Sequence, residues 1–181
     1  GLQKEVIIID DGSTDGTKEI LKNLENRFST FSKEGASKAL NKYKIFYQEK
    51  NQGKGAALKK GFLAAKGDII LIQDADLEYN PDEYKVLLQP ILEGKADVVY
   101  GSRLMTSRPH HVLLYWHYLG NKLITTFSNM LTNLNLTDME TGYKVFTRRV
   151  IEKIAPNLKS KRFGIEPEIT AKVAKNKFRI Y

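Results

Sequence analysis

Cysteine is absent from this chain of 181 residues. Without cysteine the chain forms no disulfide and offers no thiolate to a metal, which agrees with a cytosolic protein. Long apolar runs are lacking as well, because no stretch approaches the roughly 20 uninterrupted apolar residues that cross a bilayer. We also expect no signal peptide, since the chain enters a predicted strand within a few residues of Gly1. These absences exclude a disulfide-stapled scaffold and a thiolate metal site.

Acidic residues are fewer than basic ones: 21 Asp and Glu against 29 Lys and Arg give a formal net charge of +8. Such a charge favours an anionic partner, which is nucleic acid, acidic lipid or a phosphorylated substrate. No nucleic-acid-binding signature is present, and the lysines are scattered along predicted helices, as on solvated helix faces. We therefore expect no nucleic-acid partner, and the charge alone does not choose between the other two.

A short apolar run followed by acids stands in the middle of the chain. Residues 69–72 are consecutive apolar residues, which predicts a strand buried on both faces, as in parallel sheets covered by helices. Asp74 and Asp76 follow, with Glu78 close behind. Because alternate residues of an extended chain point to the same side, both aspartates can face one cation, and Mg²⁺ and Mn²⁺ prefer such oxygen ligands. The alternative is that either aspartate caps the next turn.

The start of the chain has a similar arrangement. A predicted strand over residues 5–9 is followed by Asp10 and Asp11, a Gly-bounded turn over residues 12–16, and a helix expected from about Thr17. Carboxylates at such a strand end can accept hydrogen bonds from a base or ribose, and the helix N-terminus attracts phosphate. Capping and turn formation explain the same residues equally well.

Glycine punctuates the loop over residues 49–55, which follows a predicted strand at 43–47 and leads into a helix. Lys54 in this loop could reach a phosphate group. The loop is not the phosphate-cradling loop of nucleotide hydrolases, because no Gly-Lys-Ser/Thr follows four residues after a first glycine. A phosphate contact for Lys54 is therefore a hypothesis without support from that motif.

Strands and helices alternate over the first hundred residues, which is typical of a parallel α/β sheet covered by helices. The last of these strands, residues 97–100, ends at Gly101-Ser102-Arg103. Arg103 fits two roles, as counter-ion of the acids at neighbouring strand ends or as ligand of a diphosphate. Ligands of open α/β sheets bind beyond the carboxyl ends of the strands, so we expect the acids and Arg103 to share one rim of the sheet.

The second half of the chain has a different pattern. Residues 110–134 predict one long helix that is rich in apolar and aromatic side chains. Such a helix either packs in the core or rests on a membrane or partner, since Trp and Tyr suit that boundary. Its histidines do not have the spacing of a zinc site. Asp138 and Glu140 follow, either as a catalytic base or as loop acids paired with nearby Arg or Lys.

Five short motifs, taken together and in this order, resemble those of family 2 glycosyltransferases with the GT-A fold. They are residues 9–17, 51–55, 74–78, 101–103 and 141–144, with the sequences IDDGSTDGT, NQGKG, DADLE, GSR and TGYK. Within that family the chain is most similar to the polyprenyl-phosphate branch, which includes dolichyl-phosphate mannose synthases and dolichyl-phosphate glucosyltransferases. The resemblance implies an α/β fold of the Rossmann-like GT-A type, with a mostly parallel sheet flanked by helices.

The resemblance also implies roles for individual residues. Asp10 and Asp11 would contact the base and ribose of the nucleotide. The full set of implied nucleotide-binding residues is Asp10, Asp11, Gly12, Ser13, Lys54, Asp74 and Ala75. A Mg²⁺ or Mn²⁺ ion would be held by Asp74 and Asp76, with help from Glu78, where some relatives have Gln. Asp76 and Arg103 would be catalytic, with Arg103 near the diphosphate or the acceptor phosphate.

The implied reaction is metal-dependent transfer of a hexose from a UDP- or GDP-sugar to a polyprenyl phosphate, dolichyl or undecaprenyl. An acceptor phosphate is already ionised near neutral pH, so the protein must supply positioning and charge neutralisation rather than a strong base. Attack on the face opposite the diphosphate predicts inversion at the sugar. The aromatic helix would lie near the cytoplasmic face of a membrane, where a basic protein meets anionic headgroups.

The resemblance has two gaps, because the family's first strand is missing before Gly1 and the chain stops within a predicted strand. We therefore expect a single GT-A domain over residues 1–181, truncated at both ends. Two other classes fit part of the pattern. A receiver-like signalling domain also carries paired acids after its first strand, but it is shorter and needs a late lysine that this sequence does not place. A sugar nucleotidyltransferase has its Gly-rich signature near the N-terminus, and the later motifs argue against it.

Overall fold

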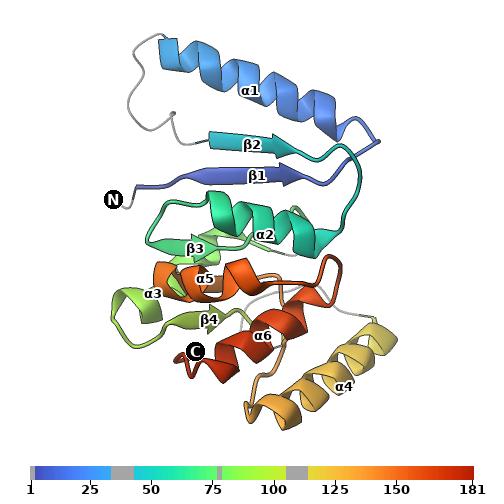
Figure 1. The fold of residues 1–181 in the computed structure, drawn as a ribbon, viewed down its shortest axis with the longest axis vertical. Helices are drawn as coiled ribbons and strands as arrows, with labels where there is room; N and C mark the ends of the chain where they lie inside the picture. Colours follow the sequence, from blue (N-terminus) through green and yellow to red (C-terminus); the bar gives the residue numbers. More distant parts are fainter. Residues whose placement is uncertain (1–2, 34–42, 77–78, 105–113) are drawn as a thin grey trace. The chain divides into compact units, whose positions relative to one another are not determined.

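The computed structural model describes residues 3–33, 43–76, 79–104 and 114–181 of the chain (Figure 1). The chain divides into two compact units, the first formed by residues 1–67 and 159–165 and the second by residues 68–158 and 166–181. Each unit contains one sheet of the described residues. The single GT-A domain over residues 1–181 stays a prediction.

The first unit is built on two parallel strands. Strands β1 (Val6–Asp10) and β2 (Tyr43–Tyr47) pair in the register Val6↔Tyr43 to Asp10↔Tyr47. Helix α1 (Thr17–Lys33) lies along β2, and helix α2 (Lys54–Ala64) packs on β1 (Figure 1). This strand–helix–strand–helix order is the one that the apolar periodicity predicts, and α1 begins at the predicted residue.

A distant piece of chain, residues 159–165, completes the first unit at the start of α2. The Ala56 backbone N–H donates to the Lys161 carbonyl at 3.0 Å. A Cβ placed on Gly55 would lie 2.2 Å from the Ser160 carbonyl oxygen, well inside van der Waals contact. The backbone of this segment therefore reaches the helix only because position 55 has no side chain.

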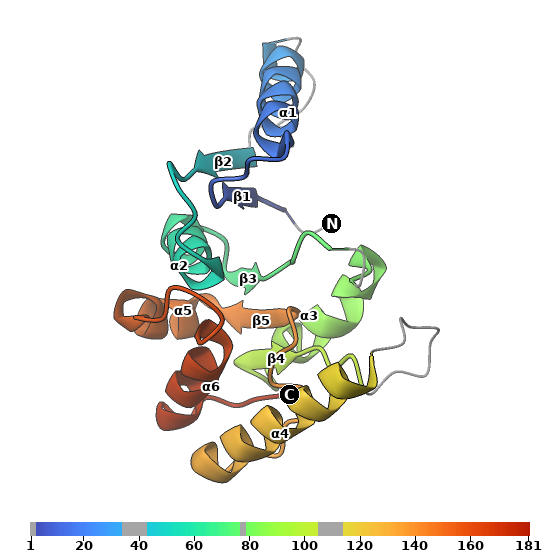
Figure 2. The same ribbon diagram turned by 90° about the vertical axis from the view of Figure 1, so that its right-hand side faces the viewer.

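The second unit has a three-stranded sheet in the order β3-β5-β4 (Figure 2). Its strands are β3 (Ile69–Leu71), β4 (Val98–Tyr100) and β5 (Lys144–Thr147). The central strand β5 runs antiparallel to both neighbours. Its first residues consequently lie beside the last residues of β3 and β4, and the pairing continues outside the strands through Ile72 N–H to Lys144 O (2.9 Å) and Gly101 N–H to Tyr143 O (2.8 Å).

Helices surround this sheet, and their bounds complete the second unit. They are the 3₁₀ turn η2 (Pro81–Glu83), α3 (Tyr84–Leu92), α4 (Tyr115–Thr132), α5 (Arg148–Ile154), the 3₁₀ turn η3 (Ala155–Asn157) and α6 (Ile165–Lys175). Asn followed by Pro is typical of a helix start, and η2 begins in this way, because the Asn80 side chain accepts from the Asp82 N–H at 3.0 Å. The helix predicted over residues 110–134 is α4, and residues 105–113 lie outside the described chain.

A cluster of buried apolar side chains from several elements forms the core beside this sheet. Its members are Tyr79, Leu87, Ile91, Ala96, Val99, Tyr143 and Val145. The end of the chain adds a short parallel bridge, Val98↔Ile180, which gives a partner to the predicted strand in which the chain stops. Arg179 anchors this bridge by two hydrogen bonds from its guanidinium to the Asp97 carboxylate, both 3.1 Å.

Candidate active site

In the first unit, the Asp11 carboxylate organises the loop that follows β2. Its Oδ1 accepts from Gln48 Nε2 at 2.6 Å and from the Gln52 N–H at 2.8 Å, and its Oδ2 accepts from the Gly53 N–H at 2.7 Å. Three donors from one loop fix the carboxylate at the end of β1. The structure therefore supports the turn-forming interpretation of Asp11, and its contact with a nucleotide stays a prediction.

Asp10 differs from its neighbour because half of its carboxylate has no partner. The residue is 4% exposed. Its Oδ1 accepts from the Ser13 N–H at 3.2 Å, whereas its buried Oδ2 has no hydrogen-bond partner within the part of the chain that the structure describes. An unsatisfied buried acceptor costs about 1–3 kcal/mol. This oxygen is therefore suited to accept from a ligand donor, such as a hydroxyl or a base N–H.

The glycine after these acids brings two loops together. Gly12 has φ +74°, and a Cβ placed there would lie 2.7 Å from both the Asn51 nitrogen and the Lys50 carbonyl carbon. Glycine is thus required both by backbone conformation and by the approach of the 48–53 loop. Lys54, at the end of this loop, is the first residue of α2 and half-buried.

In the second unit, Asp74 and Asp76 follow β3 but do not continue it. The strand ends at Leu71, and residues 72–76 are irregular. The argument from alternation along an extended chain is therefore wrong for these two residues. Asp74 is half-buried, and Ala75 and Asp76 are exposed. Glu78, the third predicted metal ligand, lies outside the described residues.

The Asp74 carboxylate packs against the backbone of Gly142, just before β5. A Cβ on Gly142 would lie 2.3 Å from Asp74 Oδ2 and 2.9 Å from the Tyr79 hydroxyl oxygen. That hydroxyl accepts from the Gly142 N–H at 2.6 Å. The antiparallel β5 thus carries Gly142 to the edge of the sheet where β3 ends, and Asp74 and Gly142 meet there.

Arg103, after β4, is held by a buried acid from the loop before β5. Its Nε donates to Asp138 Oδ2 at 2.8 Å, and its Nη2 donates to Asp138 Oδ1 at 3.1 Å. Asn121 of α4 adds a third side-chain donor to the same carboxylate, at 2.9 Å. The Asp138 side chain is 0% exposed and that of Arg103 is 24% exposed. Of the two interpretations, Asp138 follows that of a loop acid paired with a nearby arginine.

The charge state of Asp138 follows from this surrounding. Burial acts to raise the pKa of its carboxyl, but the hydrogen bonds from Arg103 and Asn121 outweigh burial and hold that pKa below its ordinary value. The carboxyl is therefore ionised near neutral pH and fully committed to its donors. Such a group positions an arginine and is poorly suited to act as a general base.

Sequence reasoning missed three residues that shape this edge of the second unit: Tyr79, Tyr143 and Lys144. The rings of Tyr79 and Tyr143 lie 4.4 Å apart between centroids. Lys144 is 1% exposed, its ammonium donates to the Thr141 carbonyl, and it lies 5.2 Å from the centroid of the Tyr100 ring. For Tyr143 and Lys144 the signal was the TGYK motif, whose spacing alone does not show what each residue contacts, and no motif singled out Tyr79.

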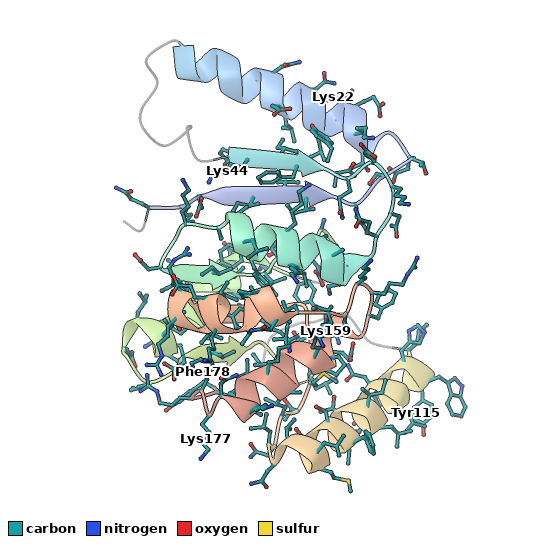
Figure 3. The ribbon with its side chains drawn as sticks, viewed as in Figure 1. Lys22, Lys44, Tyr115, Lys159, Lys177 and Phe178 are labelled. Atoms are coloured by element: carbon teal, nitrogen blue, oxygen red, sulfur yellow. The ribbon has the colours of Figure 1, made fainter. Side chains whose placement is uncertain are left out.

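Helix α4 carries its apolar side chains outward. More than half exposed are Leu114, just before the helix, and Tyr115, Trp116, Leu123, Ile124, Phe127, Met130 and Leu131 within it. Figure 3 shows this helix with Tyr115 labelled. The buried side is polar: Thr125 and Ser128 are 3% and 8% exposed. The core-packing interpretation of this helix is therefore wrong. None of the helices in the described part of the chain combines the length and the hydropathy needed to cross a membrane.

The acids present can hold a divalent cation only together with other ligands. Within residues 3–33, 43–76, 79–104 and 114–181, no group of three or more His, Cys, Asp or Glu side chains converges on one point. Asp74 and Asp76 supply two carboxylates one residue apart. This oxygen-only pair fits Mg²⁺ or Mn²⁺, which complete their shells with water and substrate phosphates.

Comparison with known proteins places this geometry in context. The chain is 28% identical over 97% of its length to the UDP-N-acetylglucosamine–dolichyl-phosphate N-acetylglucosaminyltransferase of Methanococcus voltae, of which it covers 71%. It is 29% identical over 91% of its length to a dolichyl-phosphate beta-glucosyltransferase of Trichomonas vaginalis, of which it covers 47%. The chain thus spans between about half and 71% of these two relatives.

Among solved structures, the chain resembles glucosyl-3-phosphoglycerate synthase from Mycobacterium tuberculosis, crystallised with Mn²⁺, UDP and phosphoglyceric acid. The TM-score is 0.66 at 17% identity, over 98% of this chain and 56% of the other. This likeness concerns the fold and confirms the α/β, GT-A-like class. The antiparallel β5 also argues against a receiver-like domain, whose sheet is doubly wound and parallel. A sequence model described as glycosyl transferase family 2 matches residues 1–155, and the chain therefore belongs to that family.

Proposed function

We propose that this chain is the catalytic part of a metal-dependent, inverting transferase that moves a hexose from a nucleotide-diphosphate sugar to a polyprenyl phosphate. The observation that carries the proposal is the similarity, over more than nine-tenths of the chain, to two relatives named for transfer to dolichyl phosphate. Family membership sets the reaction class. The choice of acceptor comes from these relatives, at 28% and 29% identity.

The donor nucleotide would be bound through residues of the first unit. Asp10 Oδ2 is a buried acceptor without a partner among the described residues, which suits the hydroxyls of ribose or an N–H of the base. Asp11, Gly12 and Ser13 hold the turn around it. Lys54, at the start of α2, would contribute a positive charge toward a phosphate.

The diphosphate would be bound through the acids of the second unit. Asp74 and Asp76, with Ala75 between them and Glu78 beyond, would hold a Mg²⁺ or Mn²⁺ ion. When bound, the cation supplies charge neutralisation for the departing nucleoside diphosphate.

The residues around the acceptor would orient it rather than remove a proton from it. A phosphate monoester is ionised near neutral pH and can attack the anomeric carbon directly, which predicts inversion. Arg103 has one guanidinium face committed to Asp138. This arginine would place its positive charge near the acceptor phosphate or the diphosphate.

The outward apolar face of α4 would rest on the membrane that holds a lipid acceptor. Trp116 and Tyr115 at its first turn are 75% and 67% exposed, and such amphipathic rings suit the headgroup level. The formal net charge of +8 favours an anionic surface. The protein would then act from the cytoplasmic face as a peripheral protein at α4.

The metal-dependent part of the proposal is tested by thermal unfolding of the purified protein with UDP, GDP and their hexose conjugates, each with and without Mn²⁺. We expect a higher Tm only when nucleotide and Mn²⁺ are both present. A ligand at 100 times its Kd stabilises a protein by about 2.7 kcal/mol, so the shift is large enough to measure. The preferred nucleotide also identifies the base. Equal Tm values with and without Mn²⁺ would contradict the proposal.

Asp76→Asn tests the metal clamp directly. We expect this variant to lose sugar transfer to polyprenyl phosphate and most of the Mn²⁺-dependent nucleotide stabilisation, because the amide cannot replace the charge of the carboxylate. Asp82→Asn is the matched control, since Asp82 is also exposed and lies six residues further along the chain. Transfer by Asp76→Asn at the rate of the control would refute the clamp.

A further inference from the structure

We infer that Gly142 is a positioning residue that holds the Asp74 carboxylate in place for the metal–diphosphate site. This inference rests on the proposed function and assigns part of its geometry to a backbone position outside the acidic motif. Gly142 lies in the loop before β5, 68 residues from Asp74 in the sequence, and both belong to the second unit.

The Asp74 carboxylate lies so close to the Gly142 backbone that position 142 has no room for a side chain. A Cβ at position 142 would lie 2.3 Å from Asp74 Oδ2 and 2.9 Å from Asp74 Cγ. Real Cβ atoms essentially never come this close to another heavy atom, so any side chain at 142 would push the carboxylate away. Asp74 is therefore seated directly on the Gly142 backbone.

The backbone of Gly142 does not itself require glycine. Among the described residues, the glycines with positive φ are Gly12, Gly16, Gly53 and Gly94, and Gly142 is not one of them. Its conformation is thus open to alanine, and no turn geometry requires glycine there. What excludes a larger residue is the contact with Asp74 and Tyr79. The glycine consequently serves the carboxylate rather than the fold of its own loop.

Hydrogen bonds hold the loop around Gly142 at several points. The Thr141 hydroxyl donates to the Gly101 carbonyl, and the Lys144 ammonium donates to the Thr141 carbonyl. Thr141 and Lys144 are 0% and 1% exposed. The Gly142 N–H donates to the Tyr79 hydroxyl at 2.6 Å. A loop held at these points keeps the Gly142 backbone in place against the Asp74 carboxylate.

The test uses Gly142→Ala in the whole protein, with Mn²⁺ as probe, titrated alone and in the presence of UDP or GDP. Free Mn²⁺ is measured by electron paramagnetic resonance. We expect the variant to bind Mn²⁺ in the presence of nucleotide at least about tenfold more weakly than the wild type, because a displaced Asp74 loses part of its contact with the ion. Gly120→Ala is the matched control, since a Cβ at Gly120 meets nothing within 4 Å.

A double-mutant cycle separates positioning from general damage to the fold. If Gly142 acts through Asp74, Gly142→Ala should add little to the loss already caused by Asp74→Asn, so the two effects are strongly non-additive. A merely structural role would weaken binding in both backgrounds alike. Additive losses would therefore overturn the inference.

Further outcomes distinguish this inference from the proposed function. A wild type without nucleotide-dependent Mn²⁺ binding overturns both. A wild type that binds, together with a Gly142→Ala variant that binds equally well, overturns the inference alone. If Gly142→Ala does not fold, Tyr79→Phe decides, because it removes only the hydroxyl that accepts from Gly142. We expect it to weaken Mn²⁺ binding in the same direction, and wild-type affinity in Tyr79→Phe would count against the inference.

Discussion

Asp138 shows how a buried acid is kept charged in this protein. Its side chain is 0% exposed, and an isolated carboxylate in such a place would be protonated or destabilising. Three side-chain hydrogen bonds, two from Arg103 and one from Asn121, replace the lost water. The acid in turn fixes the guanidinium at the end of β4, where the proposed reaction needs a cation.

Replacing Arg103 by methionine removes the charge that balances Asp138. We expect Arg103→Met to lower the free energy of unfolding by about 3 kcal/mol at pH 7, because one partner of a buried pair leaves the other uncompensated. The pKa of Asp138 is lowered in the folded protein, so the pair stabilises above the unfolded-state pKa of about 3.9 and loses this effect as pH falls through the lower, folded value.

Urea unfolding at pH 7 and at about pH 3 checks this prediction. The destabilisation by Arg103→Met should shrink at the lower pH, since a protonated Asp138 needs no counter-ion. Arg27→Met is the control, because Arg27 is an exposed residue of α1. An equal effect of both substitutions at pH 7 would argue against the buried pair.

At the scale of the element, α4 reverses the usual arrangement of an amphipathic helix. It turns Asn121, Thr125 and Ser128 toward the second unit, and it turns its large apolar side chains outward. Thr125 lies in the middle of a chain of hydrogen bonds, since its hydroxyl donates to Asn121 Oδ1 and accepts from the Met139 N–H. The helix is thereby attached through polar contacts, and its apolar face is left for another surface.

The double variant Leu123→Ser/Phe127→Ser tests which surface that is. The two side chains are 64% and 63% exposed, so we expect stability to change by no more than about 0.5 kcal/mol. Binding to vesicles of phosphatidylcholine with phosphatidylglycerol is measured by flotation. We expect the double variant to lose this binding, because binding depends on the apolar area that the helix inserts into the membrane interface. Leu63→Ser, at a residue of α2 that is 61% exposed, is the control. A concentration-dependent dimer that the double variant abolishes, without vesicle binding by the wild type, would contradict the membrane assignment.

Helix α2 gives a second prediction at this scale, from two glycines with opposite surroundings. Gly55→Ala should destabilise by about 1–3 kcal/mol despite the helix propensity of alanine, because its Cβ would meet the Ser160 carbonyl oxygen at 2.2 Å. Gly61→Ala should stabilise by up to about 1 kcal/mol, because the nearest atom to its Cβ is Ile9 Cγ1 at 3.7 Å. Thermal unfolding of both variants checks the sign of each change. Stabilisation by Gly55→Ala would contradict the close contact between segment 159–165 and α2.

At the scale of the whole molecule, hydrogen-bonded acids and the excess of basic residues together determine how stability depends on pH. The hydrogen bond from Arg179 is the main cause that lowers the pKa of Asp97. Burial acts to raise the pKa of Glu5, but hydrogen bonds from Lys66, Lys44 and Gly67 outweigh it and lower that pKa. Asp138 behaves in the same way. Each of these carboxylates therefore stabilises the folded chain more when it is charged than when it is protonated.

We expect stability to fall steeply as the pH drops below about 4. A carboxyl whose folded pKa is lowered stabilises above its unfolded pKa and stops doing so as pH falls through its folded pKa. Protonation of the remaining acids also raises a net charge that is already +8, which adds self-repulsion. Urea midpoints between pH 8 and pH 3 measure this, and a midpoint that rises toward acid pH would contradict it.

Much of the local structure could be predicted because its causes lie within a few residues. The apolar run before Asp10 predicts β1, and the Asn80-Pro81 pair predicts the start of η2. The α/β class follows from the alternation of such segments. The family resemblance, which rests on short motifs at strand ends, is confirmed over residues 1–155.

The arrangement around the acids could not be predicted in the same way. The extended geometry expected for Asp74 and Asp76 is wrong, because β3 ends at Leu71, and nothing in the apolar run states where pairing with β5 stops. The antiparallel direction of β5 is set by partners tens of residues away. The outward apolar face of α4 has the same periodicity as a core helix, so its direction depends on which side finds hydrogen-bond partners.

Local patterns along the chain specify the elements, the family and the kinds of chemical group at the strand ends, because periodicity, capping and motif order are local properties. The packing of the folded chain, by contrast, is needed to show that Asp138 holds Arg103, that Asp74 lies against Gly142 and that the buried Asp10 Oδ2 has no hydrogen-bond partner among the described residues. Each of these facts joins residues through a hydrogen bond, a close contact or burial. Such relations are fixed by the packing of the chain in space, which no short stretch of residues encodes.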